Sequence, residues 1–214
     1  MLTKIEINSI FASARLRLFL AWYLLFCFIY LTLGFSNKAD VLTASAIDDK
    51  IVFWPPAILI YASHFAIVAV TAWVILDKKK WLFWYVSIVL ASLSAFVVFA
   101  IWPTTIQRDQ TLSLLIGSRW LSLYEWLYRF DPAANCSPSL HVALSTICAF
   151  SIWSEKRKLM GSIWLIWSLG IATSTLLTKQ HYAIDVVYGW LLALFALLVT
   201  PLILAVNKDA AYNF

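Results

Sequence analysis

Six long stretches of the chain are almost entirely apolar, and short polar segments separate them. They cover residues 17–35, 56–76, 81–102, 139–153, 159–177 and 183–206. A helix needs about 20 mainly apolar residues to cross the hydrocarbon core of a membrane, so each stretch is predicted to span it, although 139–153 is short. The runs also lack the alternation of a barrel strand. The pattern therefore predicts an all-α fold, a polytopic membrane bundle of six transmembrane helices.

The first apolar run has a second interpretation, because Arg15 and Arg17 precede it as basic residues precede the core of a signal peptide. The run is long, however, and no clear A-x-A cleavage site follows Gly34. We therefore expect an uncleaved first span.

Segment 111–130 differs from the six runs, because its apolar residues recur at the spacing of one helix face. Arg119 and Arg129 lie elsewhere on that helix. Such a segment is expected to form an amphipathic helix lying in the membrane interface. The apolar positions are Leu112, Leu115, Trp120, Leu123 and Trp126.

Composition supports an integral membrane protein. Hydrophobic residues make up 63% of the chain and charged residues 13%, with a mean hydropathy of +0.83, whereas a soluble domain has about 45–50% apolar and about 25% charged residues. No internal repeat, low-complexity tract or linker divides the sequence. We therefore expect one membrane-embedded domain, residues 1–214.

The distribution of cations predicts the orientation. Asp77-Lys-Lys-Lys80 and Glu155-Lys-Arg-Lys158 connect adjacent spans, and Arg15 and Arg17 precede the first one. Basic loops stay in the cytoplasm, so both termini are predicted to be cytoplasmic in a plasma (inner) membrane protein. Segments 36–55, 103–138 and 178–182 then lie on the extracytoplasmic side. The net charge of +5 is mostly a topology signal, and no basic patch remains for nucleic acid.

The most specific polar pair begins the last run. His181 and Asp185 are four residues apart, so on a helix they lie on one face. The carboxylate can then accept a hydrogen bond from one imidazole nitrogen and leave the other free to attack as a nucleophile. The alternative is a pair that satisfies itself at a helix start, where aspartate suits the helix dipole.

A second polar segment begins the fourth run. Ser137 and Pro138 are typical of an N-cap followed by proline at the first helical position. This cap would leave the backbone N–H groups of Ser139 and Leu140 free to bind a phosphate. His141 could then protonate a leaving oxygen. The alternative is a plain helix cap beside a half-buried histidine.

Together these two segments resemble motifs of the type 2 phosphatidic acid phosphatase (PAP2) superfamily, which includes lipid phosphate phosphatases and phospholipid head-group transferases. Its second motif, P-S-G-H, is matched by Pro138-Ser-Leu-His141, and its third, S-R-x5-H-x3-D, by Ser174-Thr-x5-His181-x3-Asp185. The P-S-L-H form resembles the branch with inositol phosphorylceramide synthases. The resemblance covers most of the chain.

The resemblance implies a role for each matching residue. His181 would be the nucleophile that forms a phosphohistidine, with Asp185 orienting it. His141 would be the acid for the leaving group, and Ser139 would bind phosphoryl oxygens beside Leu140, which replaces the glycine of the motif.

The family's cationic residues are only partly present. In the first motif, K-x6-R-P, Arg108 matches the arginine, but the lysine position is Ile101 and the proline position is Asp109. Thr175 replaces the arginine of the third motif. Since a phosphoryl transition state needs cations, we expect Arg108 and Lys179 to supply them. Lys179 would share a face with Thr175 if the helix continued, and Arg119 and Arg129 are reserves.

Other polar residues carry weaker signals. His64, inside the second run, favours an interhelical hydrogen bond over catalysis. No cofactor is expected, and a metal site is disfavoured because His181 and Asp185 lack a third ligand at a suitable spacing.

The resulting expectation is a membrane-embedded lipid phosphate phosphatase or phosphotransferase. The expected partners are the lipid bilayer and a lipid phosphate such as phosphatidic acid, phosphatidylglycerophosphate or a polyprenyl diphosphate; nucleic acid and an obligate protein partner are not expected. The alternatives are a lipid head-group phosphotransferase and, in a different class, a non-catalytic membrane scaffold or transporter.

Overall fold

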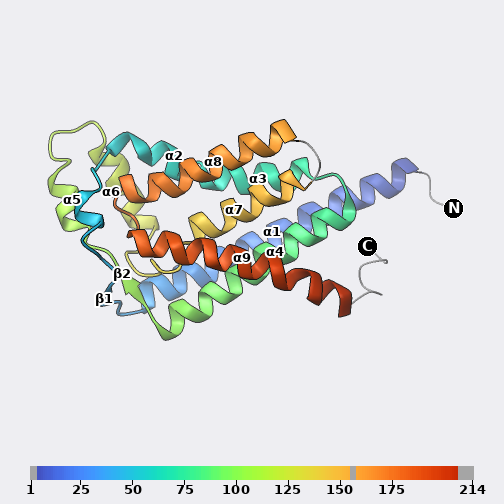
Figure 1. The fold of residues 1–214 in the computed structure, drawn as a ribbon, viewed down its shortest axis with the longest axis horizontal. Coiled ribbons are helices and arrows are strands. Elements are labelled where there is room, and N and C mark those ends of the chain that lie inside the picture. Colours follow the sequence, from blue (N-terminus) through green and yellow to red (C-terminus); the bar gives the residue numbers. More distant parts are fainter. Residues whose placement is uncertain (1–3, 155–157, 207–214) are drawn as a thin grey trace.

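The computed structural model describes residues 4–154 and 158–206, and most of them are helical (Figure 1). The long helices are α1 (Lys4–Ser36), α4 (Lys78–Ile101), α8 (Lys158–Leu177) and α9 (Ala183–Val206). A fifth long element runs from Pro55 to Val74 and consists of η2 (Pro55–Ala57), α2 (Ile58–Ala62) and α3 (His64–Val74). The shorter elements are β1 (Val41–Leu42), η1 (Asp48–Lys50), β2 (Thr104–Thr105), α5 (Asp109–Ser113), α6 (Leu121–Phe130) and α7 (Leu140–Trp153).

Within the described residues, five of these elements are long and apolar enough to cross a membrane. They correspond to five of the six predicted runs, and the chain is a multi-pass membrane protein. The remaining run forms α7, which has 14 residues and is about 21 Å long, shorter than a hydrocarbon core of about 30 Å. A crossing by α7 therefore stays a prediction.

The central position of α7 explains its composition. It packs against α3, α4, α8 and α9, and ten of its 14 residues are buried. A helix that is apolar on all sides is stable where other helices surround it. The beginning of α7 approaches α9 closely, because a Cβ on Gly189 would lie 2.7 Å from the backbone oxygen of Ser139.

Helix α1 lies at the edge of the bundle and packs mainly along α4. Aromatic rings meet along this contact, including the pair Phe26 and Phe96, with ring centroids 5.4 Å apart. Towards the start of α1, buried Arg15 donates hydrogen bonds to the backbone oxygens of Ala72 and Trp73 near the end of α3. Cations suit the carbonyl end of a helix, so Arg15 fastens α1 to α3 there.

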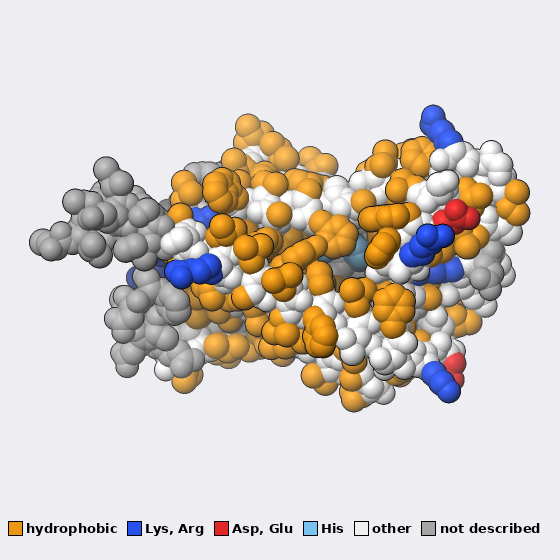
Figure 2. All heavy atoms as spheres, turned by 180° about the vertical axis from the view of Figure 1, so that it is seen from behind, with side chains coloured by type: hydrophobic (Ala, Val, Ile, Leu, Met, Phe, Trp, Pro, Cys, Tyr) orange, Lys and Arg blue, Asp and Glu red, His pale blue; other side chains and the backbone are white. Residues whose placement is uncertain are grey.

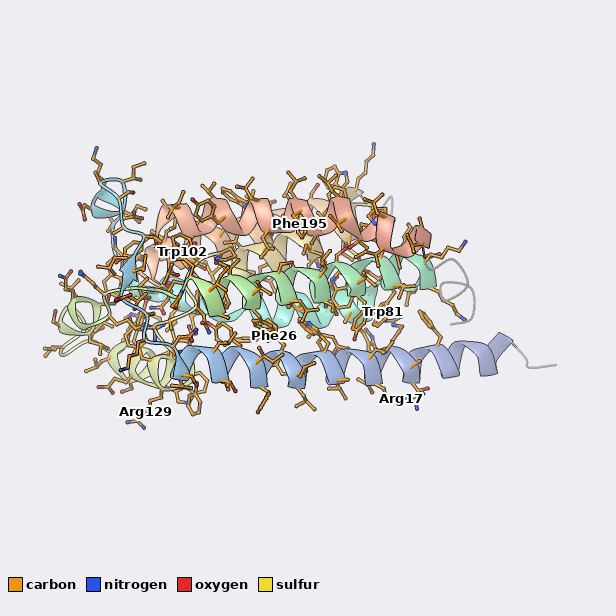
Figure 3. All side chains as sticks on the ribbon, turned by 90° about the horizontal axis from the view of Figure 1, so that it is seen from below. Arg17, Phe26, Trp81, Trp102, Arg129 and Phe195 are labelled. Atoms are coloured by element: carbon orange, nitrogen blue, oxygen red, sulfur yellow. The ribbon has the colours of Figure 1, made fainter. Side chains whose placement is uncertain are left out.

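The surface has the layering of a membrane protein. Apolar side chains cover the middle of the molecule, and charged side chains lie mainly towards its two ends (Figure 2). Trp102 lies with Arg129 at one end and Trp81 with Arg17 at the other (Figure 3). Figure 1 also places the beginning of α1 and the end of α9 at the same end of the bundle. Residues 1–3, 155–157 and 207–214, which include both termini and most of the predicted basic loop 155–158, lie outside the described residues.

The opposite end carries the connecting segments, where β1 and β2 form a parallel pair and α5 and α6 lie beside it (Figure 1). The amphipathic helix expected in segment 111–130 is present only in the second half of the segment, as α6. Turns at residues 114–120, including Gly117 with φ of +79°, separate α6 from the short α5, because a left-handed residue cannot continue a helix. Leu115 and Tyr124 are buried here, whereas Trp126 is exposed.

Candidate active site

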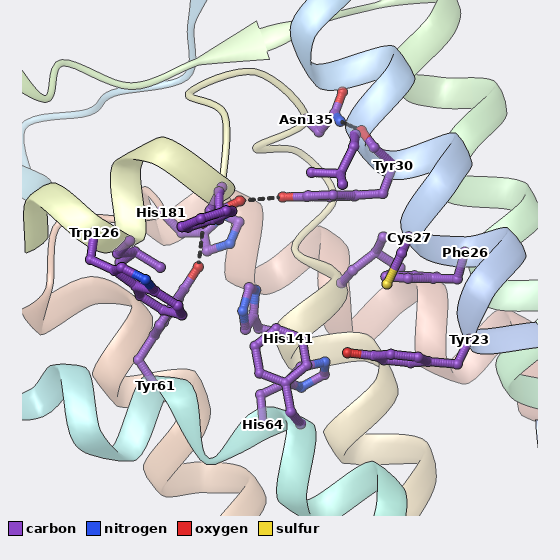
Figure 4. Close-up of a pocket in the computed structure, with 16 residues that line it drawn as sticks. Tyr23, Phe26, Cys27, Tyr30, Tyr61, His64, Trp126, Asn135, His141 and His181 are labelled. Carbon is purple, nitrogen blue, oxygen red and sulfur yellow. Dashed lines mark hydrogen bonds between the residues drawn. The ribbon is translucent and has the colours of Figure 1, made fainter. Parts of the chain in front are cut away.

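A cavity of about 480 Å³ lies at the end of the bundle that carries α5 and α6, and all three histidines of the chain line it (Figure 4). His64 comes from α3 and His141 from the first turn of α7, while His181 precedes α9. The ring centroids of His141 and His181 are 5.8 Å apart, and those of His64 and His141 are 4.6 Å apart. The fold therefore brings together two histidines that are 40 positions apart in the sequence.

His181 lies in the turn between two helices. Helix α8 ends at Leu177 and α9 begins at Ala183, so His181 and Asp185 do not share a helix face as predicted. Nδ1 of His181 is 3.7 Å from the nearer oxygen of Asp185, longer than a hydrogen bond. Among the described residues, this nitrogen has no hydrogen-bond partner. The two groups are close enough for charge interaction when the imidazole is protonated.

Asp185 is fully buried and has other partners. Its carboxylate accepts hydrogen bonds from the backbone N–H of Tyr182 at 2.8 Å and from the hydroxyl of Thr43 at 2.8 Å. The bond to Tyr182 caps the start of α9, because a carboxylate in the first turn of a helix accepts from the N–H just before it. Asp185 thus stabilises the helix start and also places a negative charge behind the imidazole of His181.

The helix cap at α7 is two residues later than predicted. Helix α7 begins at Leu140, and the hydroxyl oxygen of Ser139 accepts from the N–H of Val142 at 3.5 Å. The N–H of Ser139 donates to the backbone oxygen of Asp185 at 3.0 Å, so it is not the free phosphate donor that we expected. This bond joins the start of α7 to the start of α9, and it holds His141 opposite His181.

Arg108 lies beside the histidine site. Its guanidinium donates to the side-chain oxygen of Gln180 at 2.9 Å and to the backbone oxygen of Asp131, and it stacks 4.4 Å from the ring centroid of Tyr128. Gln180 directly precedes His181 in the sequence. Arg108 is therefore a cation that the structure places near the site.

The prediction that Lys179 faces the same gap was wrong. The helix does not continue past Leu177, and Lys179 adopts a left-handed backbone conformation with φ of 54°. Its ammonium donates to the backbone oxygens of Asp48 and Ile51 at 2.8 and 2.6 Å. Lys179 thus holds the loop around η1 against the start of α9.

The reserve cations are also away from the site. Arg119 and Arg129 are exposed, and neither is among the described residues that line the cavity. Arg119 instead lies over the ring of Trp120, with 5.1 Å to its centroid. Thr175 donates its hydroxyl to the backbone oxygen of Ala172, so it does not replace the arginine of the family motif.

A group of polar residues on the other side of the cavity could not be recognised from the sequence. Asp131 accepts hydrogen bonds from the phenols of Tyr30 at 2.7 Å and Tyr61 at 2.9 Å, and Tyr61 stacks on His141 with 4.2 Å between centroids. Both tyrosines lie in apolar runs, where they are indistinguishable from core aromatics. Asp131 follows the amphipathic segment, and no pattern in its neighbouring residues marks it as functional.

His64 is closer to the chemistry than expected. The interhelical hydrogen bond predicted for His64 is made with the backbone of His141 in α7, while Nδ1 of His64 is buried with no hydrogen-bond partner among the described residues. The two imidazole rings also pack side by side. In the described part of the chain, no group of three or more histidine, cysteine, aspartate or glutamate side chains is placed to hold a metal ion.

Two other ionisable groups near the site remain neutral at ordinary pH. Burial, together with the neighbouring charge of Asp185, raises the pKa of the Cys136 thiol well above its usual value. Burial also raises the pKa of the Tyr128 phenol, which lies under Arg108. Cys136 is therefore a poor nucleophile.

Comparison with known proteins agrees with this geometry. The family model of the PAP2 superfamily matches residues 31–199. No curated protein and no solved structure matches the chain. The matched region includes His64, His141 and His181, the helices that bring them together, and Arg108. On this match over most of its length, the chain belongs to the PAP2 superfamily and has the fold of its phosphatase-type membrane enzymes.

Proposed function

We propose that the protein is a membrane-embedded lipid phosphate phosphatase or phosphotransferase that works through a phosphohistidine on His181. The observation that carries this proposal is the approach of His141 to His181, at 5.8 Å between centroids, inside one cavity. The cavity wall is largely apolar. Arg108 lies beside the cavity, where it donates a hydrogen bond to Gln180, the residue before His181. Such a site suits a phosphate carried on a lipid.

In the first step, Nε2 of His181 attacks the phosphorus atom. The nitrogen–phosphorus bond forms as the bond from phosphorus to the leaving oxygen breaks, and His141 gives that oxygen its proton. Asp185, 3.7 Å from Nδ1, stabilises the positive charge that develops on the imidazole of His181. Arg108 stabilises the negative charge on the phosphoryl oxygens.

In the second step, an acceptor hydroxyl attacks the phosphohistidine. His141, now neutral, removes the proton from the acceptor, the nitrogen–phosphorus bond breaks, and His181 is regenerated. Water as the acceptor gives inorganic phosphate, whereas a lipid hydroxyl as the acceptor gives a new lipid phosphate. The two reactions share the same residues and differ only in what reaches the intermediate.

The proposed site faces the extracytoplasmic side of the plasma (inner) membrane. This orientation rests on the basic residues of segments 77–80 and 155–158, which favour the cytoplasm. The loop 75–77 lies at the end of the bundle opposite the site. A full crossing by α7, with six spans in total, is part of the same proposal.

The decisive experiment uses purified protein with lipids that carry a radiolabelled phosphate. The panel contains phosphatidic acid, phosphatidylglycerophosphate and a polyprenyl diphosphate, each with and without diacylglycerol or ceramide as an acceptor. Label in inorganic phosphate shows hydrolysis, and label in the acceptor lipid shows transfer. Unchanged turnover by His181→Ala would remove the nucleophile assignment, and a lack of turnover of every lipid would favour a scaffold or transporter.

A further inference from the structure

Three cavities follow one another between α1 and α3. The first is the histidine cavity of about 480 Å³, and a second of about 280 Å³ shares Tyr23, Phe26, His64 and Phe65 with it. A third, of about 370 Å³, shares Phe19 and Ala69 with the second. Neighbouring cavities share lining residues, so the three form a row along α1 and α3, called here the α1–α3 groove.

The groove is apolar along most of its length and polar at its ends. The histidines and Asp131 lie at one end, and Arg15 lies at the other. Near Arg15, small side chains (Ala12, Ala69 and Ala72) line the wall. Figure 2 shows a histidine side chain at the bottom of a hollow in the apolar band of the surface. The groove is therefore lined for a hydrocarbon chain that begins at a polar head group.

The packing of α1 leaves this space open. Along its length α1 packs on α4, as with Phe19 and Trp84, whose centroids are 6.4 Å apart. At one end Arg15 ties α1 to the carbonyls of α3. At the other end Tyr30 of α1 and Tyr61 of α2 meet on Asp131 (Figure 4). These two links join α1 to α3 at one end of the groove and to α2 at the other.

The length of the groove limits the kind of lipid. On α1 it extends from Leu31 to Ala12, which is about 28 Å at 1.5 Å per residue. The hydrocarbon core of a membrane is about 30 Å thick, so one leaflet contributes about 15 Å. An ordinary acyl chain, which stays within one leaflet, fills about half of this length. The groove therefore fits a tail that passes the midplane.

We propose that the α1–α3 groove binds the tail of the substrate, and that this substrate is a lipid phosphate with one hydrocarbon chain longer than a leaflet, of the polyprenyl phosphate class. The phosphate lies at His141 and His181, and the chain runs past Phe26 and Phe19 towards Arg15. This inference rests on the proposed function for the position of the phosphate. The proposal would be overturned if a diacyl lipid phosphate occupied the groove as well as the single-chain lipid does.

A first experiment blocks the groove at Ala69, which lines both the second and the third cavity. Ala69→Trp fills this position, whereas Val70→Trp is the matched control, because Val70 is 38% exposed and points about 100° away around the helix. The substrates are a polyprenyl monophosphate of eleven isoprene units and farnesyl monophosphate, which has three. We expect Ala69→Trp to lower kcat/KM at least tenfold more for the long substrate than for the short one. Equal losses for both substrates, or the same selective loss in Val70→Trp, would overturn the proposal.

A second experiment measures binding without turnover in a His181→Ala background. Maleimide labels native Cys27, which lines the histidine cavity, and the thiol introduced by Ala69→Cys, and mass spectrometry follows the two positions separately. The long polyprenyl monophosphate should slow labelling at both positions, and farnesyl monophosphate only at Cys27. If dioleoyl phosphatidic acid protects both thiols as well as the polyprenyl lipid does, the single-chain assignment is wrong.

The two inferences can fail separately. Protection of both thiols by the polyprenyl lipid, with no turnover of any lipid phosphate by the unmodified protein, leaves the groove assignment standing and removes the proposed function. Turnover that depends on His181, without protection of the thiol introduced by Ala69→Cys, supports the proposed function and removes the groove assignment.

Discussion

Arg108 and Asp131 form an ion pair, with 3.6 Å between the guanidinium and the carboxylate, beside the cavity that the histidines line. The same carboxylate accepts hydrogen bonds from Tyr30 and Tyr61. The cation proposed to bind the phosphate is thus held, and partly neutralised, by an acid that also joins α1 to α2. A substitution of Asp131 can measure its effect on the charge of Arg108 and its effect on the stability of the α1–α2 contact.

Asp131→Asn should lower the KM for a lipid phosphate several-fold, because less of the charge of Arg108 is neutralised. It should also lower the free energy of unfolding by about 1–3 kcal/mol, because two buried phenols lose a charged acceptor. Kinetics and the Tm in detergent measure the two effects, with exposed Asp49→Asn as the control. A higher KM would mean that Asp131 mainly positions Arg108.

Arg108→Gln and Lys179→Met should separate phosphate binding from loop anchoring. Loss of a group that stabilises the transition state costs about 10²–10³-fold in rate, so Arg108→Gln should lower kcat/KM by about that factor. Lys179→Met removes two bonds to backbone oxygens around η1 and should lower the Tm with little change in KM. A large KM effect of Lys179→Met would restore it as a phosphate ligand.

His141→Gln should lower kcat for an alkyl lipid phosphate by about 10²–10⁴-fold, the usual contribution of a general acid. An aryl phosphate leaves without protonation, so the variant should lose much less activity on that substrate. The comparison of kcat on the two substrates checks the role. Equal losses on both would indicate that His141 is needed only for the geometry of the cavity.

The activity should show a bell-shaped dependence on pH. His181 attacks only when it is unprotonated, so activity falls at low pH; His141 donates only when it is protonated, so activity falls at high pH. Profiles of kcat/KM for the unmodified protein and for His141→Gln test this, since the variant should lose the fall at high pH. A flat profile between pH 5 and 8 is incompatible with two working histidines.

Gly189→Ala should destabilise the site, because its methyl group would lie 2.7 Å from the backbone oxygen of Ser139. Overpacking of this kind costs about 1–3 kcal/mol, and here it would also push α7 from α9 and separate His141 from His181. Gly170→Ala is the matched control, because its nearest atom would be a methyl group of Ile60 at 3.6 Å. Similar Tm and kcat values for the two variants would show that the close approach is not required.

Removal of divalent metal ions should leave activity unchanged, because a histidine nucleophile needs no metal-activated water in its first step. Turnover before and after treatment with a chelator measures this. Loss of all activity, with recovery on adding the metal back, would count against the prediction.

The helices could be predicted because the membrane imposes one rule on each of them. A span must be apolar over its length, so the runs 159–177 and 183–206 correspond closely to α8 (Lys158–Leu177) and α9 (Ala183–Val206). The interruption of the second span at Ser63 was not predicted. A composition rule gives the extent of a span and says little about irregular turns inside it.

The candidate site was only partly predictable, and its errors have a common origin. His141 and His181 could be singled out because polar residues are rare at the ends of apolar runs. The predictions for Lys179 and Ser139 were wrong because both misplaced a helix boundary: one continued the helix past Leu177, and the other began the next helix at Pro138. Lys179 instead has a φ of 54°, and Ser139 caps α7 two residues later than expected.

The sequence by itself determined the apolar segments, the family motifs and the two histidines, since each of these depends on residues close together in the chain. The tertiary structure alone decided which groups surround the histidines. Asp131 meets Tyr30 across 101 positions and Tyr61 across 70, and the α1–α3 groove exists because α1 packs on α4. Contacts of this kind depend on how the helices are arranged in space, which local residue patterns do not specify.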